Sequence, residues 1–302
     1  MVELRDPAGP EPHHPVLPLT RFAPAPTGHL HLGHVANAIY VWGMARARDA
    51  RVMLRIEDHD RQRCRPDYER ALLDDLEWLG FVPDMYPPFE FRAGRCEGRQ
   101  SDRDAVYRAA LRPLVDSGLV FGCDCSRKEV GGSEYPGTCR TRGLPLADGI
   151  GWRVRMEPGI ERFDDVLIGP QSQDPATEFG DLLVRDRLGN WTYHWAAATD
   201  DTLQGVTLVI RGVDLLDSTG RQLRLARLLG RRDPPVFAHH PLIMKSATQK
   251  LSKSDRDTGI RDLRKAGWSP QQLIGLAAYR VGLQADDSAA SADDVSRFFV
   301  TQ

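Results

Sequence analysis

Arg21-Phe-Ala-Pro-Ala-Pro-Thr-Gly-His-Leu-His-Leu-Gly-His34 joins an apolar segment at 17–22 to a segment, 31–48, whose apolar residues recur at helical spacing. This order predicts a strand, a loop and a helix. Gly33 carries no Cβ, so a ligand can approach the backbone closely at this point. The two imidazoles that flank it can donate hydrogen bonds to phosphate oxygens. The stretch therefore predicts a nucleotide-binding turn after the first strand.

Strand and helix segments continue to alternate after this turn. The predicted strands are 17–22, 51–56, 206–210 and 236–243, and the predicted helices are 31–48, 66–79, 101–118, 218–229 and 270–281. Gly80 suits the C-terminal cap of the helix at 66–79, and Ser101-Asp-Arg-Asp104 resembles a capping box at the start of the next helix. The alternation predicts an α/β fold with a parallel sheet of the Rossmann type, whose ligand binds at the carboxyl ends of the strands.

A second motif, Lys250-Leu-Ser-Lys-Ser254, lies near the other end of the chain. Lysines on such a loop supply compact positive charges that can follow a departing pyrophosphate. Together the two motifs indicate ATP chemistry in which the α-phosphate is attacked, and Mg²⁺ is expected to accompany the ATP. The predicted catalytic residues are His31, His34, Lys250 and Lys253, and the predicted ATP contacts are His31, Gly33, His34 and Lys253.

The composition excludes several classes of protein. The chain has 302 residues, of which 41% are hydrophobic and 27% charged, and its formal net charge of -2 excludes a wholly basic nucleic-acid binder. No apolar run approaches the ~20 residues of a membrane span, and the N-terminus lacks the pattern of a signal peptide. Five prolines among the first twenty residues instead predict a flexible extension. We expect a cytoplasmic monomer with no membrane partner.

The composition also divides the chain into parts. Residues 121–180 are rich in glycine, proline and cysteine and interrupt the strand and helix rhythm, so they predict an insertion. The predicted organisation is a flexible extension at 1–16, the first half of a Rossmann catalytic core at 17–120, the insertion at 121–180, the second half with the lysine loop at 181–255, and a short helical segment at 256–302.

Three of the five cysteines, Cys123, Cys125 and Cys139, fall within seventeen residues of this insertion. In a reducing compartment such a cluster is either a set of free thiols or a metal site. Structural zinc takes four tetrahedral ligands. No histidine lies between His59 and His194, so a local Cys₃His site is excluded. The cluster predicts one structural zinc ion per chain, with three reduced thiols as the alternative.

Four blocks of sequence resemble the catalytic core of the class I glutamyl-type aminoacyl-tRNA synthetases. They are Arg21–His34, Arg55-Ile-Glu-Asp58, Val209-Ile-Arg-Gly-Val-Asp214 and Lys250–Ser254, which stand in the family's order and span most of residues 17–255. The resemblance implies a Rossmann-type catalytic domain that activates an amino acid with ATP and passes it from the adenylate to tRNA.

The amino acid implied by this resemblance is L-glutamate, which carries two carboxylates and one ammonium group. Arginine suits a carboxylate because its planar fork can bond both oxygens, and a carboxylate suits the ammonium group. The implied glutamate site consists of Arg21, Phe22, Ala23, Pro24, Ala25, Glu57, Tyr193 and Arg211. Two positions depart from the family pattern: Ala25 stands in place of a serine, and Ala197 in place of an asparagine that is common in the full-length enzymes.

Two further features resemble a truncated branch of the family. The chain stops 48 residues after Ser254, whereas a full glutamyl-tRNA synthetase continues into an anticodon-binding region. Cys123-x-Cys125-x9-Tyr135-x3-Cys139 resembles the zinc site of that branch, which implies Tyr135 as the fourth ligand. The branch transfers glutamate to the queuosine base in the anticodon loop of tRNA(Asp), so the resemblance implies tRNA(Asp) carrying queuosine as the partner.

Other functions remain open from the sequence. A glutamyl- or glutaminyl-tRNA synthetase fragment would charge a tRNA 3′ end, a small HxGH nucleotidyltransferase would lack the Arg21 and Arg55 blocks, and a binding paralogue would have lost motif residues. A basic stripe, formed by Arg221, Arg224, Arg227, Arg231 and Arg232, is either a phosphate-binding surface or a solvated helix face.

Overall fold

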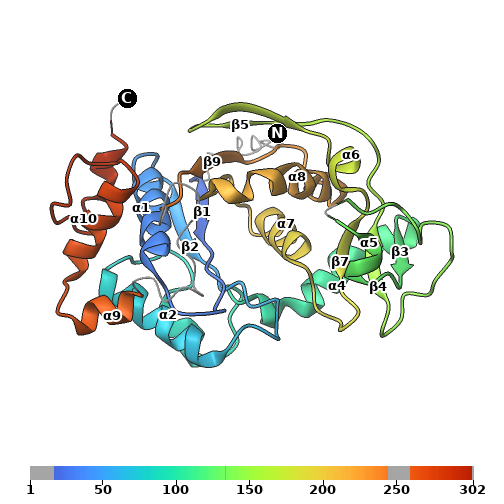
Figure 1. Ribbon diagram of the computed structural model, residues 1–302, viewed down its shortest axis with the longest axis horizontal. Coiled ribbons are helices and arrows are strands. Elements are labelled where there is room, and N and C mark those ends of the chain that lie inside the picture. The colour runs from blue at the N-terminus through green and yellow to red at the C-terminus, as the bar shows by residue number, and fades with distance from the viewer. Residues whose placement is uncertain (1–16, 133, 244–258, 301–302) are drawn as a thin grey trace, which may run out of the picture.

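The computed structural model of the chain describes residues 17–132, 134–243 and 259–300 (Figure 1). Its strands are β1 (Leu19–Phe22), β2 (Arg51–Leu54), β3 (Val120–Cys123), β4 (Gly151–Val154), β5 (Glu161–Asp165), β6 (Gly169–Gln173), β7 (Leu182–Arg185), β8 (Leu208–Gly212) and β9 (Val236–His240). The expected extension at 1–16 lies outside the described residues.

The helices follow the strands in the predicted alternation. The α-helices are α1 (Leu32–Arg46), α2 (Pro66–Leu79), α3 (Pro88–Ala93), α4 (Asp104–Asp116), α5 (Arg127–Val130), α6 (Pro175–Phe179), α7 (Tyr193–Leu203), α8 (Thr219–Leu228), α9 (Ile260–Lys265) and α10 (Pro270–Arg280). Short 3₁₀ segments are η1 (Gln100–Arg103), η2 (Val213–Ser218) and η4 (Val295–Phe298).

A parallel sheet forms the centre of the molecule. β1 pairs in parallel with β2, and β8 pairs in parallel with β9. The two pairs meet where the backbone N–H of Thr207 donates to the carbonyl of Leu19 at 2.9 Å. β5 extends the sheet beyond β9 in parallel, and β6 pairs with β5 in the antiparallel sense. The predicted parallel α/β sheet is confirmed.

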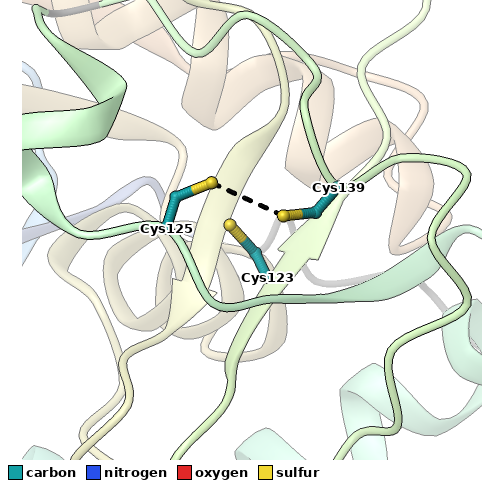
Figure 2. A group of neighbouring side chains, drawn as sticks. All are labelled: Cys123, Cys125 and Cys139. Carbon is teal, nitrogen blue, oxygen red and sulfur yellow. Dashed lines mark hydrogen bonds between the residues drawn. The ribbon is translucent and has the colours of Figure 1, made fainter.

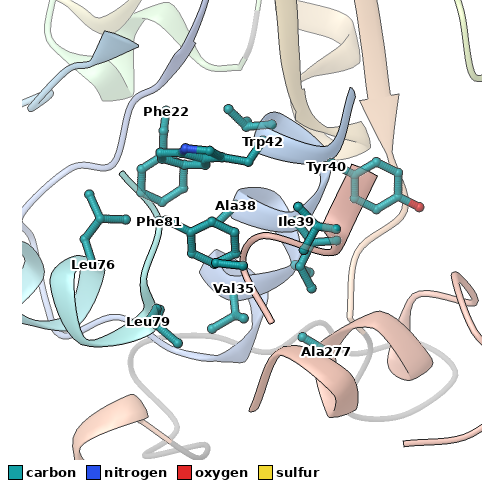
Figure 3. Close-up of a cluster of buried hydrophobic side chains, with 14 of the residues drawn as sticks. Phe22, Val35, Ala38, Ile39, Tyr40, Trp42, Leu76, Leu79, Phe81 and Ala277 are labelled. Carbon is teal, nitrogen blue, oxygen red and sulfur yellow. The ribbon is translucent and has the colours of Figure 1, made fainter. Parts of the chain in front are cut away.

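The two faces of this sheet are covered by different helices, because successive side chains of a strand point to opposite faces. On one face, Phe22 and Ile210 pack with α1, α2 and α10 in the largest hydrophobic core. Figure 3 shows Phe22 beside Trp42 there, and their ring centroids are 5.3 Å apart. On the other face, Val209 and Phe237 pack with Leu223 of α8.

A second, antiparallel sheet of β3, β4 and β7 lies on the opposite side of the molecule from α10 (Figure 1). Its own core includes residues of α4 and α7. The predicted insertion at 121–180 is therefore divided: β5 and β6 fall within that range yet belong to the central sheet. β7 lies beyond residue 180 yet pairs with β4 of the antiparallel sheet. β5 has no apolar run that would mark it as a strand, because four of its five residues are charged and only Phe163 is apolar.

Two predicted helix ends give opposite outcomes. Gly80 caps α2 with φ of 82°, as predicted from its freedom to adopt a left-handed conformation. The capping box at Ser101 is wrong, because η1 precedes α4 and Arg103, the residue before α4, makes no side-chain cap. The backbone N–H of Ser101 donates instead to Asp58 at 2.7 Å. A tertiary contact thus satisfies the donor that the capping box would have used.

Within the described parts of the chain, no helix is both long and apolar enough to cross a membrane.

Candidate active site

The predicted arginines lie at the carboxyl ends of neighbouring strands of the central sheet, Arg21 on β1 and Arg211 on β8. Arg21 is buried and ion-paired: its Nε is 3.0 Å from Asp201, and it also donates to the carbonyl of Ile210. Asp201 receives a second cation from Arg55, at 2.7 Å. The charge of Arg21 is therefore already balanced by a carboxylate of the protein.

Arg211 has surroundings of a different kind. The side chain is buried, and no carboxylate in the part of the chain that the structure describes lies within ion-pairing distance of it. Its hydrogen-bond acceptors are neutral groups of His239, Gln222, Thr219 and Tyr193, at 3.0, 2.6, 2.7 and 3.5 Å. Burial lowers the pKa of this guanidinium. A buried cation without a counterion is the feature expected of a receptor for an anionic ligand.

The other predicted glutamate contacts surround these two arginines. Glu57 is buried, and its Oε1 lies 3.2 Å from Arg55. The Tyr193 hydroxyl lies at the N-terminus of α7, 3.5 Å from Arg211. Ala23 and Ala25 are half-buried in the loop after β1, whereas Pro24 is buried.

Phe22 does not share this environment. Its side chain is 1% exposed in the hydrophobic core against Trp42, on the opposite face of β1 from Arg21. Its carbonyl accepts the backbone N–H of Arg55 at 2.9 Å. The Phe22 side chain therefore does not belong to the predicted glutamate site, because alternation along the strand turns it away.

The His31 and His34 side chains cap the N-terminus of α1. The backbone N–H of Gly33 donates to His31 Nδ1, and the backbone N–H of His31 donates to His34 Nδ1, both at 3.1 Å. Backbone N–H groups only donate, so each neutral imidazole carries its proton on Nε2. A Cβ on Gly33 would come within 2.9 Å of the His31 ring. The motif thus fixes two Nε2–H donors at a helix N-terminus, where anions bind favourably.

A pocket of about 260 Å³ lies beside these histidines. It is lined by His31, Gly33, His34, Asn37, Gly212, Asp214, His240, Leu242 and Ile243. A larger cavity, between α2 and α9, is lined by other residues. Lys250 and Lys253 lie outside the described residues, but both flanks of their segment reach this pocket. Ile243 lines it, and Gly259 forms a β-bridge with His31.

Several residues of the site were not predicted. They are Asp165, Asp201, Thr219, Gln222 and His239 around the arginines, and Asn37, Asp214 and His240 in the pocket. One signal could have identified Asp201: an acidic pair inside the otherwise apolar helical stretch 195–201, since buried acids require cationic or donor partners. His239 and His240 end an apolar strand at the predicted ligand edge, which is a comparable signal.

The basic stripe is used mostly inside the protein. Arg224 and Arg227 both pair with the buried carboxylate of Glu161, at 2.5 and 2.6 Å. Arg231 donates to two backbone carbonyls, at 2.6 and 3.0 Å. Arg221 lies over the Phe179 ring at 3.7 Å. These contacts favour a structural role for the stripe over a phosphate-binding surface.

The three predicted cysteine ligands converge in the insertion (Figure 2). The Sγ atoms of Cys123, Cys125 and Cys139 lie within 4.8 Å of one another, and those of Cys125 and Cys139 are 3.5 Å apart. The Tyr135 hydroxyl lies 3.5 Å from Cys123 Sγ and accepts the backbone N–H of Cys139 at 2.8 Å. The three thiols therefore form one cluster, and the Tyr135 hydroxyl lies beside it.

Two histidines, the half-buried His194 and the buried His239, make stability depend on pH. Burial, aided by the charges of Arg221 and Arg211, lowers the pKa of His194 to about 3, and burial with the charge of Arg211 lowers the pKa of His239 to about 4. Both have a pKa of ~6.5 in the unfolded chain, so the unfolded chain binds more protons than the folded chain as the pH falls.

We therefore expect the free energy of unfolding to fall as the pH is lowered from about 6.5 to about 4. Urea denaturation at a series of pH values measures this. A His239→Gln variant should show a shallower dependence, because it lacks one of the two groups. Identical slopes in the variant and the unmodified protein would contradict the assignment.

A family model described as "tRNA synthetases class I (E and Q), catalytic domain" matches residues 19–134 and 150–301. Curated relatives agree with it. A glutamyl-Q tRNA(Asp) synthetase of Burkholderia cenocepacia is 40% identical over 280 residues, which are 88% of each chain. Another, of Rhodobacter capsulatus, is 40% identical over 288 residues, covering 85% of this chain and all of the relative.

Solved structures of longer proteins share the fold. The structure of a glutamate tRNA ligase from Elizabethkingia meningosepticum, in complex with its amino acid, superposes with a TM-score of 0.76 and 26% identity. A glutamate-tRNA synthetase from Elizabethkingia anophelis gives a TM-score of 0.77 and 27% identity. The match covers 93% of this chain but only 64% and 65% of those chains, respectively.

Proposed function

The chain belongs to the glutamyl-Q tRNA(Asp) synthetases, within the class I synthetases for glutamate and glutamine, and we propose that it carries out the reaction for which its relatives are named. It activates L-glutamate with ATP and transfers the glutamyl group to the queuosine base in the anticodon loop of tRNA(Asp). Transfer releases AMP. We place this reaction in the cytoplasm, where tRNA and ATP are available.

The environment of Arg211 is the observation that supports this proposal most directly. A buried guanidinium surrounded only by neutral acceptors gains most from an anionic ligand, because the ligand supplies the missing counterion. Glutamate has such a group at its side chain, whereas glutamine offers only a neutral amide. Tyr193 lies beside the guanidinium and can donate to the same carboxylate. Glu57 supplies the negative charge for the ammonium group.

The activation step uses the pocket beside α1. An oxygen of the glutamate α-carboxylate attacks the α-phosphorus of ATP, and the bond from that phosphorus to the pyrophosphate oxygen breaks. The Nε2–H donors of His31 and His34 stabilise the negative charge on the phosphate oxygens, and Lys250 and Lys253 stabilise the departing pyrophosphate. Mg²⁺ bound to ATP would supply further positive charge to the phosphate oxygens. The protein contributes chiefly by positioning the two reactants.

The site of glutamyl attachment tests the branch of the family. Incubating the protein with labelled glutamate, ATP and tRNA(Asp), with and without queuosine, is expected to label only the tRNA that carries queuosine. Nuclease digestion then locates the label, which should remain with the anticodon nucleoside. Label on the 3′-terminal adenosine would overturn the proposal in favour of a synthetase that charges the tRNA end.

We also propose a structural zinc ion bound by Cys123, Cys125, Cys139 and Tyr135. Tetrahedral zinc with bonds of about 2.3 Å to sulfur requires sulfur atoms about 3.8 Å apart, which the observed cluster approaches. Arg153 Nε lies 3.3 Å from Cys123 Sγ and Arg142 lies 3.4 Å from Cys139 Sγ. These cations offset the negative charge of three thiolates. The metal would link the loops that carry its four ligands, which contribute to a small hydrophobic cluster.

Metal analysis of the purified and desalted protein is expected to find one zinc ion per chain. A Cys139→Ser variant should lose most of the zinc and unfold at a lower temperature, because one of four ligands is weakened. Cys96→Ala is the matched control, since Cys96 is buried in a different core. Substantially less than one zinc ion in the unmodified protein, or full zinc in the Cys139 variant, would contradict the site.

A further inference from the structure

His239 stands between Arg211 and a buried acid. Arg211 Nε lies 3.0 Å from His239 Nε2, and a guanidinium nitrogen can only donate, so His239 Nε2 must accept. The proton of the neutral imidazole therefore lies on Nδ1. That nitrogen is 2.6 Å from Asp165 Oδ2. The three side chains form a linear chain, carboxylate to imidazole to guanidinium, in which each hydrogen bond determines the direction of the next.

The Asp165 carboxylate is itself fixed by several hydrogen bonds. Its Oδ2 also accepts the backbone N–H of His239 at 3.0 Å, and its Oδ1 accepts the backbone N–H groups of Leu167 and Ile168 at 2.9 and 3.1 Å. Four N–H donors thus surround a carboxylate that is 4% exposed at the end of β5. A carboxylate saturated in this way cannot rotate, so it fixes the tautomer of the neighbouring imidazole.

We propose that Asp165 and His239 are positioning residues for glutamate: they hold the Arg211 guanidinium in the orientation that binds the substrate carboxylate. This inference rests on the proposed function. Neither residue touches the substrate in it. Their role is to orient a catalytic-site arginine that has no acidic partner of its own among the described residues.

The donors of Arg211 make the consequence specific. Short bonds to His239, Gln222 and Thr219 occupy three of its five N–H groups, one on each nitrogen. The second N–H of Nη1 makes only the 3.5 Å contact with the Tyr193 hydroxyl, and the second N–H of Nη2 has no acceptor among the described residues. A carboxylate can therefore bond both terminal nitrogens, which matches the bidentate geometry that arginine prefers. The Tyr193 hydroxyl lies beside one of these two positions. Without the bond to Nε, the planar fork is free to turn away from the substrate.

The tautomer of His239 determines whether this bond exists. The groups facing the imidazole are Asp165 from β5, Arg211 from β8 and the Thr219 hydroxyl from α8, at 3.3 Å, while Arg21 on β1 adds a more distant positive charge. If Asp165 became asparagine, its NH₂ group would favour an Nδ1 acceptor and move the imidazole proton to Nε2. Two N–H groups would then face each other, and Arg211 would lose its orientation.

The test compares three variants by glutamate-dependent ATP–pyrophosphate exchange, with glutamate and ATP varied separately. Asp165→Asn and His239→Leu are expected to raise KM for glutamate at least ~10-fold, the size of effect that losing a hydrogen bond to a charged group produces. KM for ATP and kcat should change less than about 3-fold. His239→Gln retains an acceptor at the position of Nε2, so its KM for glutamate should stay within about 3-fold of the unmodified value.

Each outcome separates the inference from its premise. If the unmodified protein shows no glutamate-dependent exchange, the proposed function is wrong and the inference falls with it. If that protein is active and the variants share its KM for glutamate, only the inference is overturned. A parallel rise in KM for ATP, or equal losses in His239→Gln and His239→Leu, would also overturn it, because a purely structural role predicts either result. Thermal unfolding of each variant identifies any that fail to fold, and the two His239 variants decide the matter if Asp165→Asn does not.

Discussion

Replacing Arg211 with leucine is expected to lower kcat/KM for glutamate about 1,000-fold in ATP–pyrophosphate exchange, with KM for ATP nearly unchanged. The loss corresponds to ~4 kcal/mol, within the range for removing one partner of a buried charge pair. The effect is large because the guanidinium has no carboxylate partner within the described structure, so the substrate supplies its only close negative charge. Glutamate should also cease to raise the unfolding temperature of the variant.

Because Arg211 has no carboxylate partner among the described residues, its replacement should impair glutamate binding without preventing folding. Arg211→Leu removes a buried charge without leaving a carboxylate unpaired, so the variant should still fold. Arg55→Leu is the contrasting control, because it would remove a cation from both Asp201 and Glu57 and should destabilise the protein. Near-normal glutamate kinetics in a folded Arg211 variant would exclude this residue as the carboxylate receptor.

The contrast between the two arginines shows which part of the site cannot be predicted from the sequence. Local pattern places Arg21 and Arg211 at the carboxyl ends of strands, and the structure confirms these positions. Nothing in the local sequence shows which of the two guanidinium groups is paired with a carboxylate of the protein. Arg21 is neutralised by Asp201, a residue 180 positions away, and this pairing exists only after the chain has folded. Which arginine remains available for an anion is therefore a property of tertiary structure.

Two sequence predictions differ from what the structure shows. Phe22 follows Arg21 directly, so a block of sequence that includes both residues combines opposite faces of β1. The composition of residues 121–180 places β5 in the insertion, and the four charged residues of β5 give no sign of a strand, yet β5 pairs with β9 in the central sheet. By contrast, α2 has the predicted bounds of Pro66 and Leu79, because proline and glycine act through local backbone geometry that needs no distant partner.

The cysteine cluster could be predicted from the sequence only in part. Their spacing predicts that they can meet, and the structure brings their Sγ atoms within 4.8 Å of one another. The contacts around the thiols could not be predicted from their spacing: Arg153 comes from β4, lies over the Tyr135 ring at 3.7 Å and donates to Cys123. A cation that approaches a thiol cluster across a sheet leaves no signal in the spacing of the cysteines themselves.

Lys253→Ala is expected to lower glutamate-dependent ATP–pyrophosphate exchange at least ~100-fold, since it removes a transition-state contact worth about 3 kcal/mol. Lys253 lies outside the described residues, so the argument rests on the flanks of its segment. Ile243 on one side lines the pocket with His31 and His34, and Gly259 on the other side pairs with His31. Both ends of the segment are therefore anchored at the proposed phosphate site.

The position of Lys253 makes the expected effect kinetic. Gly259 is six residues beyond Lys253, and six residues of extended chain span about 20 Å. Lys253 is therefore near enough to Gly259, and so to His31, to reach a pyrophosphate held beside the α1 N-terminus. A charge that meets the leaving group as it departs lowers the barrier more than it improves ATP binding, so kcat should fall more than KM for ATP rises. Lys265→Ala, at the exposed end of α9, is the control and should retain full exchange. A loss shared equally by both variants would indicate a general effect of positive charge, and near-normal exchange in a folded Lys253 variant would remove this lysine from the catalytic step.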